Sequence, residues 1–401
     1  MDQLSFLHLA AIVLAWIGAC TGHAVILVAS LNWWYSVPLR RSVLSLLKKL
    51  HALAILAGPV VFWAVFGFRL ETLFAPPPGD SWQWALSGYF CLCVALGLAA
   101  FPSITLWRLL RRRPAALLSN HTQTVDVAER LGFRPIGRGR RRQLAYLPGN
   151  EIFRVDLSER TICLPRLPAA WDGLSILHLS DLHLCGTPDR VFYQHVMDLC
   201  RDWQADLVAI TGDIVDSDKH HRWIVPVLGR LRWKQAAFAV LGNHDSWHEP
   251  ALVRRRLQRL GIRVLGNSWE EIEVRGERLI VIGHEGPWFR PGPDLSNCPQ
   301  RAFRLCLSHT PDNIRWARQN GIDLMLAGHN HGGQIRFPVI GSVFVPSRYS
   351  RRYDCGTFYE PPTVLHVSRG LGGQEPVRYN CRPEVTKIVL KRATTLYEAP
   401  Q

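Results

Sequence analysis

Two histidines one residue apart, His329 and His331, stand in the motif GHNHGG directly after the apolar run IDLMLA. Imidazoles at this spacing can point toward different centres, which suits a shared metal cluster. The plainer interpretation is a turn that carries two solvated histidines. This motif alone is compatible with both interpretations.

Polar side chains of the same kinds follow four other short apolar runs. They are Asp181 and His183 in SDLHL, Asp213 and Asp216 in TGDIVD, Asn243, His244 and Asp245 in LGNHD, and His309 in SHTPD. Each motif alone has a structural explanation, because Asp after a strand commonly caps a helix and Gly-Asn or Gly-Asp pairs form turns. The carboxyl ends of strands in an open α/β sheet converge on one crevice, however. Five such motifs in order therefore predict one polar site.

The elements that would position these side chains alternate along the chain. Strands are predicted at residues 174–180, 206–210, 236–241, 303–308 and 323–327, with helices near 188–203, near 249–260 and from Pro311 onward. This alternation is typical of α/β layering.

The ordered motifs resemble the signature of the calcineurin-like metallophosphoesterases, D-x-H, G-D-x-x-D, G-N-H-D/E, H and G-H-x-H, over about residues 174–390. The resemblance implies an α/β fold, a two-sheet β-sandwich flanked by helices. It also implies two divalent metal ions and the following residue roles. One metal is held by Asp181, His183 and His331, the other by Asn243, His309 and His329, with Asp213 bridging them, His244 as proton donor or transition-state stabiliser, and Asp245 orienting His244. Asp216 is expected to shape its loop.

The metal chemistry follows from the ligand types. Mixed nitrogen and oxygen ligands favour Mn, Fe or Zn over Mg or Ca, and we expect manganese, with iron or zinc as alternatives. A water between two cations about 3.5 to 4 Å apart loses its proton near neutral pH, and this metal-activated hydroxide attacks phosphorus in line with the leaving oxygen.

Three apolar stretches, residues 6–31, 50–68 and 84–107, precede the motifs. Each is long enough to span a bilayer, and tryptophan and tyrosine lie near the expected interfaces. A signal peptide is the alternative for the first stretch, but the basic n-region is missing. A buried helical domain fits less well, because the stretches lack a polar face.

Basic residues predict the orientation of these spans. Lysines and arginines at 40–49 and 108–113 flank the spans on one side, whereas the loop 69–83 sets Arg69 against Glu71 and Asp80. The positive-inside rule then places the N-terminus outside and everything after the third span in the cytoplasm. We therefore expect a multi-pass protein of the inner membrane with a cytoplasmic catalytic domain.

The formal net charge of +15 is concentrated beyond the third span, where residues 108–142 contain ten arginines. Such a segment is attracted to anionic lipid by about 1 kcal/mol per nearby charge. A nucleic-acid arm is the alternative, but the run lacks interleaved aromatic residues. The ten cysteines form no CxxC pair and indicate free thiols in a reducing compartment.

The sequence thus predicts a membrane domain (1–110), a basic juxtamembrane linker (111–173), a metallophosphoesterase domain (174–392) and a tail (393–401). The predicted function is hydrolysis of a phosphodiester or pyrophosphate bond by a membrane-anchored, dinuclear-metal enzyme. The alternatives are a general phosphodiesterase or nuclease acting on nucleotides or nucleic acid, and a catalytically silent membrane scaffold or sensor. Residues 332–390 resemble the membrane-associated branch of the family, which includes bacterial phosphodiesterases and UDP-2,3-diacylglucosamine pyrophosphatases of lipid A biosynthesis.

The expected partners are the lipid bilayer and a phosphorylated, amphiphilic substrate. UDP-2,3-diacylglucosamine fits this description, and other lipid phosphoesters and cyclic or dinucleotide substrates are the alternatives. Nucleic acid is not an expected partner, and the oligomeric state is not predicted. Five C-terminal arginines either bind phosphates or lie solvated on the surface: Arg348, Arg351, Arg352, Arg369 and Arg378. His284 and Glu285 depart from the family pattern, which puts substrate access at that position in question.

Overall fold

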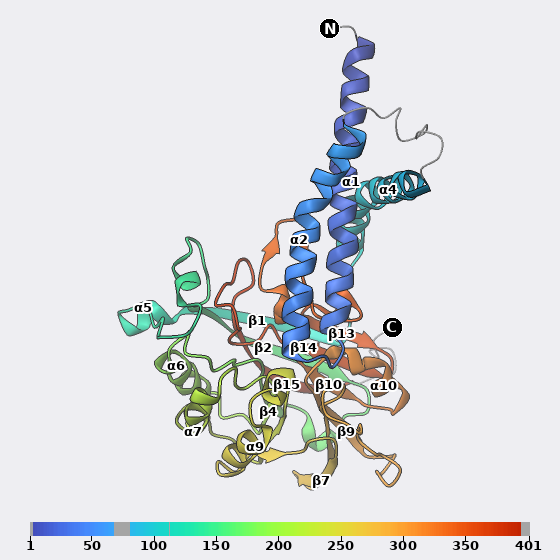
Figure 1. Cartoon of the computed structure of the whole chain (residues 1–401). Coiled ribbons are helices and arrows are strands. Elements are labelled where there is room, and N and C mark those ends of the chain that lie inside the picture. Colours follow the sequence, from blue (N-terminus) through green and yellow to red (C-terminus); the bar gives the residue numbers. More distant parts are fainter. Residues whose placement is uncertain (1–2, 68–80, 112, 394–401) are drawn as a thin grey trace. The chain divides into compact units, whose positions relative to one another are not determined.

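The computed structural model describes residues 3–67, 81–111 and 113–393, and the chain folds into two compact units (Figure 1). The first comprises residues 1–35 and 39–112, and the second comprises residues 36–38 and 113–401.

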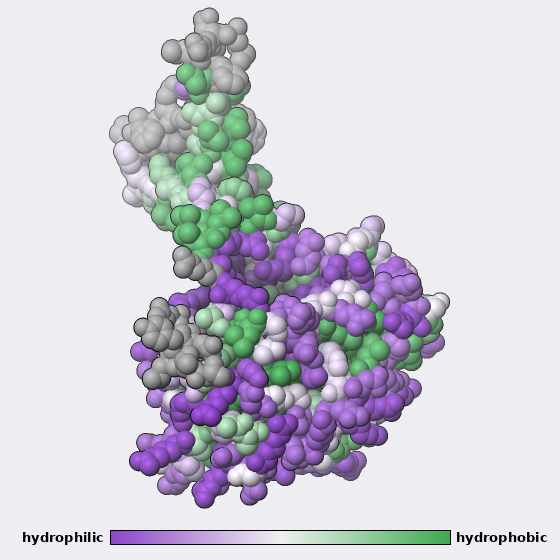
Figure 2. Space-filling view, turned by 180° about the vertical axis from the view of Figure 1, so that it is seen from behind, coloured by the Kyte–Doolittle hydropathy of each residue, from purple (hydrophilic) through white to green (hydrophobic). Residues whose placement is uncertain are grey.

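Unit 1 consists of long apolar helices, α1 (Gln3–Tyr35), α2 (Arg41–Phe66) and α4 (Ser81–Leu110). All three are long and apolar enough to cross a membrane. They contain the predicted stretches 6–31 and 84–107 and most of the stretch 50–68, since α2 ends at Phe66. Leucines such as Leu56 (73% exposed) and Leu109 (79% exposed) point outward, so the outside of the unit is largely apolar (Figure 2). A helix that is apolar all round has no polar face to present to water. The loop 69–80 used to predict orientation lies outside the described residues.

Glycines let two of these helices approach closely. A Cβ on Gly22 of α1 would lie 1.9 Å from the carbonyl oxygen of Cys93 on α4, and one on Gly97 would lie 1.9 Å from that of Gly18. Small residues allow such close backbone packing between helices in membranes.

Unit 2 is a mixed α/β sandwich of two sheets. The seven-stranded sheet has the order β1 (Leu117–Asp126), β2 (Arg154–Leu164), β15 (Glu384–Arg392), β3 (Ser175–Leu179), β4 (Leu207–Thr211), β5 (Ala236–Val240) and β6 (Arg263–Val264). The six-stranded sheet has the order β13 (Gly356–Glu360), β14 (Thr363–Val367), β10 (Leu324–Ala327), β9 (Phe303–Ser308), β8 (Glu277–His284) and β7 (Trp269–Val274). Their central strands are parallel, and a small hairpin pairs β11 (Arg336–Phe337) with β12 (Gly341–Ser342).

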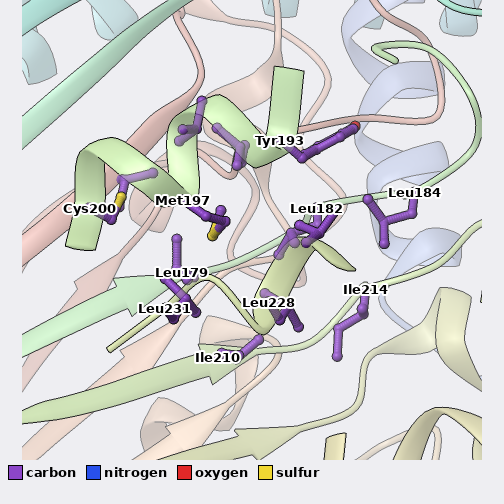
Figure 3. Packing of buried hydrophobic residues seen from close by; sticks show 14 of the residues in the cluster. Leu179, Leu182, Leu184, Tyr193, Met197, Cys200, Ile210, Ile214, Leu228 and Leu231 are labelled. Carbon is purple, nitrogen blue, oxygen red and sulfur yellow. The ribbon is translucent and has the colours of Figure 1, made fainter. Parts of the chain in front are cut away.

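Helices flank the sandwich. They are α5 (Val127–Leu131), α6 (Arg190–Arg201), α7 (Ile224–Leu228), α8 (Asn243–Ser246), α9 (Pro250–Gln258) and α10 (Ile314–Gln319), with 3-10 turns η1 (Arg142–Tyr146), η2 (Ala169–Trp171), η3 (Asp218–Trp223), η4 (Pro311–Asn313), η5 (His331–Gly333) and η6 (Ser350–Tyr353). One apolar cluster lies between the sheets, and a second lies between the first sheet and α6, α7 and α9. Figure 3 shows part of the second cluster, where Leu179 and Ile210 of the sheet face Met197 of α6 and Leu228 of α7.

The predicted strands and helices between residues 174 and 327 are confirmed to within a few residues. The predicted linker at 111–173 is wrong, because β1 and β2 are part of the first sheet. Strand β2 pairs in parallel with β15 from Asp156 opposite Glu384 to Leu164 opposite Arg392. Strand β2 was not predicted because its charged residues are not typical of a buried strand. In the fold, Arg160 is buried and paired with Glu384, so its charge is compatible with an interior position.

Candidate metal centre

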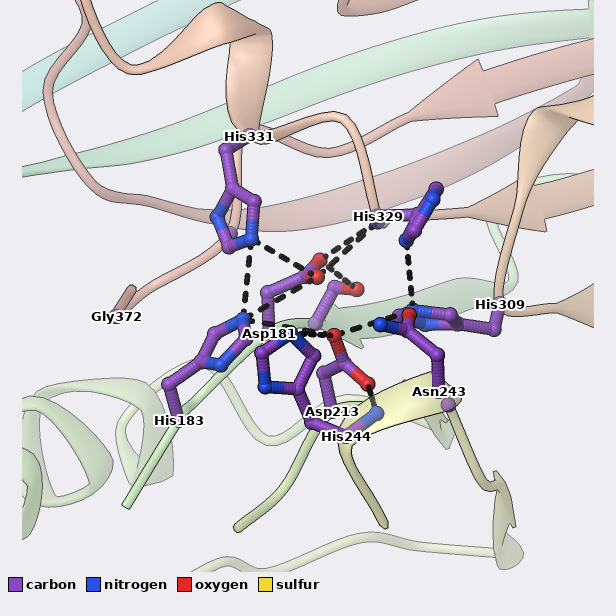
Figure 4. Close-up of polar contacts among 12 residues, drawn as sticks. Asp181, His183, Asp213, Asn243, His244, His309, His329, His331 and Gly372 are labelled. Carbon is purple, nitrogen blue, oxygen red and sulfur yellow. Dashed lines mark hydrogen bonds and ion pairs between the residues drawn. The ribbon is translucent and has the colours of Figure 1, made fainter. Parts of the chain in front are cut away.

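The predicted site residues lie together at the carboxyl ends of five parallel strands, drawn from both sheets (Figure 4). Asp181 and His183 follow β3, Asp213 follows β4, Asn243 opens α8 after β5, His309 follows β9, and His329 and His331 follow β10. All seven of these side chains are buried or nearly so. The crevice rule used on the sequence therefore identified side chains that lie together in the fold.

One cluster of potential ligand atoms is formed by Asp181, His183 and His331. The Nε2 atoms of His183 and His331 are 3.0 Å apart. The Oδ1 atom of Asp181 lies 3.5 Å from Nε2 of His331 and 3.8 Å from Nε2 of His183.

A second cluster contains Asn243, His309 and His329. Nε2 of His309 is 3.0 Å from Oδ1 of Asn243 and 3.2 Å from Nδ1 of His329. His329 and His331 thus face different clusters, which decides against two solvated histidines on a turn.

The carboxylate of Asp213 lies between the clusters. Its Oδ2 atom is 3.3 Å from Nε2 of His309 and 3.6 Å from Nε2 of His183. This oxygen is buried without a hydrogen-bond partner. A buried polar atom without a partner costs free energy, and a cation is the partner that its surroundings suggest.

The spacing of these atoms fits divalent metal ions. Two donors that each lie about 2.1 Å from one ion are roughly 3.0 to 3.4 Å apart at angles between a right angle and a tetrahedral one, which matches the closest pairs. Oxygen and imidazole ligands together are suited to transition-metal ions.

Protonation differs between the histidines of the site. Burial lowers the pKa of His309, but the carboxylate of Asp213 outweighs it and raises that pKa to about 9, so a metal ion there would displace a proton. Burial lowers the pKa of His329 to about 3, helped by the charge of His309, and burial holds the pKa of His331 well below its usual value. Burial raises the pKa of Asp213, but the charges of His309 and His244 outweigh it and lower that pKa below its usual range. Neutral imidazoles and ionised carboxylates are the forms that bind metals.

Five of these residues have a left-handed backbone. The φ angles are 52° at Asp181, 48° at His183, 52° at Asp213, 70° at His329 and 51° at His331. Such conformations are uncommon for residues other than glycine and cluster at functional sites. They explain how two ligands one residue apart serve different clusters.

Two aspartates have roles opposite to those predicted. Asp245 was expected to orient His244, but its carboxylate accepts hydrogen bonds from the backbone N–H groups of Ile214, Val215 and Gly242 at 2.9 to 3.0 Å. Asp245 lies one residue after His244 on α8, so its side chain points about 100° away around the helix axis. It holds the loops together and is not placed to touch substrate.

Asp216 is the residue that orients His244. Its Oδ1 accepts a hydrogen bond from Nδ1 of His244, and its Oδ2 accepts one of 2.9 Å from Nδ1 of His183. Nε2 of His244 then faces the cluster, 3.9 Å from Oδ2 of Asp213. The imidazole is partly exposed, which leaves it accessible to a substrate.

Several of the arginines considered as phosphate ligands have partners inside the fold. Arg369 pairs with Asp156 and Glu384, and Arg352 pairs with Glu360. Arg378 is completely buried and donates to the carbonyl oxygens of five loop residues, including that of His331 at 3.1 Å. It positions the His331 turn, a role without a motif in the sequence.

The two residues that depart from the family pattern are also structural. Glu285 is buried, pairs with Arg254 and accepts a 2.7 Å hydrogen bond from the backbone N–H of Leu241, just before the Gly242–Asp245 motif. His284 is hydrogen bonded to Asn313. The aromatic wall of the second cluster is Trp288, whose ring centroid lies 4.9 Å from that of His329.

Comparison with known proteins agrees with this geometry. The profile of the calcineurin-like phosphoesterases matches residues 174–333. Phosphodiesterase YaeI of Escherichia coli is 33% identical over 224 residues, which cover 54% of this chain and 81% of YaeI. The chain belongs to the calcineurin-like phosphoesterases. This family uses divalent metals, and the chain is accordingly a metal-dependent phosphoester hydrolase.

Two further relatives resemble this phosphoesterase. The metallophosphoesterase YkuE of Bacillus subtilis is 29% identical over 246 residues, covering 59% of this chain and 86% of YkuE. A transmembrane protein with a metallophosphoesterase domain from Danio rerio is 28% identical over 251 residues, covering 58% of this chain and 56% of that protein. The latter, together with the three apolar helices, indicates that this phosphoesterase is associated with a membrane.

Proposed function

We propose that this phosphoesterase uses two divalent metal ions to hydrolyse a phosphodiester or pyrophosphate bond of an amphiphilic substrate at a membrane surface. One observation carries the two-metal proposal. The unpartnered Oδ2 of Asp213 lies between two imidazole-containing clusters, within 3.3 to 3.6 Å of a histidine nitrogen from each.

In this proposal Asp181, His183 and His331 hold one ion, and Asn243, His309 and His329 hold the other. Asp213 is the shared ligand. Divalent ions at such a site act as Lewis acids on phosphoryl oxygens and lower the pKa of a water nucleophile. Manganese is the ion that we propose, with iron or zinc as alternatives, because the donors are mixed nitrogen and oxygen.

His244 is the proposed proton donor to the leaving oxygen. Asp216 accepts the Nδ1 proton of His244, which leaves Nε2 directed toward the cluster. An imidazole held in this way can carry a proton on Nε2 and transfer it as the phosphorus–oxygen bond to the leaving group breaks. The oxygen of the attacking water forms a new bond to phosphorus as the bond to the leaving oxygen breaks.

The amphiphilic substrate is proposed from the two units together. The helices of unit 1 are long and apolar enough to anchor the chain in a bilayer, and the positive-inside rule favours a multi-pass protein of the inner membrane with unit 2 in the cytoplasm. An enzyme anchored there meets substrates whose acyl chains rest in the membrane. UDP-2,3-diacylglucosamine of lipid A biosynthesis has this chemistry and is the first substrate to test.

The test uses the full chain in detergent with Mn²⁺ and two substrates, bis(p-nitrophenyl) phosphate and UDP-2,3-diacylglucosamine. We expect metal-dependent p-nitrophenol release and UMP release, both strongly reduced in His244→Ala. Asp218→Asn is a matched control, because Asp218 lies in the same loop as Asp216 and also contacts a histidine, His248, at 2.9 Å, but its side chain is 63% exposed.

The two substrates separate the parts of the proposal. Metal-dependent release of p-nitrophenol without UMP would refute the proposed substrate and leave the phosphoesterase chemistry, and nucleotide diesters would then be tested. Bound metal without turnover of either substrate would favour a silent scaffold or sensor.

A further inference from the structure

Exposed apolar side chains of unit 2 are concentrated in two segments. Among its described residues, nine large apolar side chains are exposed by more than a third: Leu118, Phe133, Tyr146, Leu147, Val191, Ile335, Phe337, Val339 and Val343. Seven of the nine lie within residues 132–150, which we call the basic arm, or within residues 334–343, which we call the apolar hairpin. Scattered apolar residues on a surface need no explanation, but a concentrated group does.

The two segments form one continuous surface through Tyr379. Ile335 forms a β-bridge with Tyr379, and the backbone N–H of Arg336 donates to the Tyr379 carbonyl oxygen at 2.9 Å. The hydroxyl of Tyr379 donates to the carbonyl oxygen of Pro148 in the basic arm at 2.7 Å. In Figure 1 the orange hairpin, the red loop that carries Tyr379 and the green arm rise from one side of unit 2.

This surface borders the metal centre. The apolar hairpin begins three residues after His331, and Arg336 at its base is held by Asp354 at 2.7 Å. The basic arm is tied by an ion pair between Arg141 and Glu375 to the loop that also carries Arg378. Phe337 (52% exposed) and Tyr146 (61% exposed) are thus anchored by their neighbours while their own side chains face outward.

The positive charge of the basic arm indicates an anionic partner. The arm contains five arginines and no acidic residue. Arg138, Arg140 and Arg142 are exposed and form no ion pair among the described residues. Arginines beside exposed aromatic and aliphatic side chains suit the interface of an anionic phospholipid bilayer, where cations meet phosphates and apolar groups enter the acyl boundary.

We propose that the basic arm and the apolar hairpin form a second membrane contact of unit 2, which inserts Phe337 and its neighbours into the surface of an anionic bilayer beside the metal centre. The membrane contact rests on the proposed anchoring by unit 1 but on no particular substrate. It would shorten the path from a lipid in the bilayer to the site, so that the phosphoester need not leave the interface.

The test uses the full chain in lipid nanodiscs, with a fluorescent non-natural amino acid in place of Phe337 and lipids that carry a nitroxide quencher on the acyl chain. The control position is Val191 on α6, an exposed apolar residue outside both segments. Side chains of an interfacial segment enter the acyl boundary, so quenching at 337 should exceed quenching at 191 by about threefold or more.

Charge is tested in the same nanodiscs, with phosphatidylcholine alone or mixed with phosphatidylglycerol. Each arginine near an anionic surface contributes roughly fivefold in membrane affinity, so the triple change Arg138→Glu, Arg140→Glu and Arg142→Glu should abolish the excess quenching at 337. The matched control is the triple change Arg222→Glu, Arg255→Glu and Arg259→Glu, which also reverses three exposed charges, outside both segments, and should have no effect.

Activity provides an independent measurement. Phe337→Ser should leave turnover of bis(p-nitrophenyl) phosphate unchanged and lower turnover of a vesicle-borne phosphodiester severalfold, with recovery in Phe337→Leu. Equal quenching at 337 and 191, or quenching that is insensitive to phosphatidylglycerol and to the arginine changes, would overturn the membrane contact. Absence of all turnover with the excess quenching intact would instead refute the proposed enzymatic function.

Discussion

Replacement of Asp216 by asparagine tests how the site positions its two kinds of histidine. The carboxylate accepts hydrogen bonds from Nδ1 of His183, a proposed metal ligand, and from Nδ1 of His244, the proposed proton donor. In Asp216→Asn one oxygen becomes an NH₂ group, which cannot accept a hydrogen bond from an imidazole N–H. One of the two hydrogen bonds is therefore lost and the other loses its charge assistance.

The magnitude follows from these two contacts. A hydrogen bond to a charged group contributes about 1.5 to 3 kcal/mol. If the free energy of one such hydrogen bond is lost at His244 in the transition state, kcat falls by roughly 10- to 100-fold, at about 1.4 kcal/mol per factor of ten. Loss of support for the ligand His183 should weaken metal binding by about 10- to 100-fold.

A double-mutant cycle separates the two effects. We would measure kcat on bis(p-nitrophenyl) phosphate at saturating metal, and metal affinity by titration, for Asp216→Asn, His244→Ala and the double variant. If Asp216 acts on catalysis through His244, Asp216→Asn should lower kcat by less than about threefold in the His244→Ala background, because the coupled pair has already been broken. Its effect on metal affinity should persist.

The orientation argument is refuted if Asp216→Asn lowers kcat by the same factor in both backgrounds, since the carboxylate would then act independently of His244. Asp218→Asn should match the wild type in both measurements.

Three further predictions concern the metal centre and its support. Asp213→Asn should abolish turnover and lower metal content measured by elemental analysis, and wild-type activity in this variant would contradict the site assignment. Arg378→Met should lower the free energy of unfolding by about 3 kcal/mol or more, because five carbonyl oxygens lose this donor and the three at 3.1 Å or less contribute about 1 kcal/mol each; Arg378→Lys should recover part of this in chemical denaturation. Glu384→Gln should cost about 3 to 5 kcal/mol, because it leaves Arg160 and Arg369 without their buried carboxylate. Burial raises the pKa of Glu384, but the two arginines outweigh it and hold that pKa well below its usual 4.5, so the contribution is present above pH 4.5 and lost as the pH falls further. Denaturation at pH 7 and pH 4 should therefore show a steeper loss of stability in the wild type than in Glu384→Gln.

The positions of the candidate ligands were predictable from the sequence because each follows an apolar strand and local motifs mark the strand ends. The first two strands of the sheet were not. Strand β2 reads as a charged segment, and it is buried only because Glu384, 224 residues away, neutralises Arg160. The buried location of Arg378 likewise depends on hydrogen bonds to loop carbonyl oxygens, which no local sequence motif predicts.

The aspartates show why roles are harder to predict than positions. Asp216 and Asp245 each lie two or three residues after a candidate ligand. Asp245 directly follows His244 in the sequence, whereas Asp216 precedes it by 28 residues, so sequence distance favoured Asp245. The short helix α8 turns Asp245 toward the backbone of the β4 loop, whereas the extended loop lets Asp216 reach the imidazoles. The geometry of this four-residue helix determines which aspartate faces His244, and such short elements are the least predictable part of a fold.

The left-handed ligands are held by one another as well as by the strands that carry them. The backbone N–H of Asp181 donates to the Gly212 carbonyl oxygen at 3.0 Å, and that of His183 donates to the Asp213 carbonyl oxygen at 2.9 Å. The backbone N–H of His329 donates to the Asp181 carboxylate at 3.0 Å. Three of the five uncommon backbone conformations are thus fixed by a neighbouring ligand loop, as strained conformations require. It follows that a change in one histidine side chain preserves these backbone contacts, whereas a Cβ on Gly242, which would lie 2.2 Å from Oδ1 of Asp213, displaces the proposed shared ligand and with it both clusters.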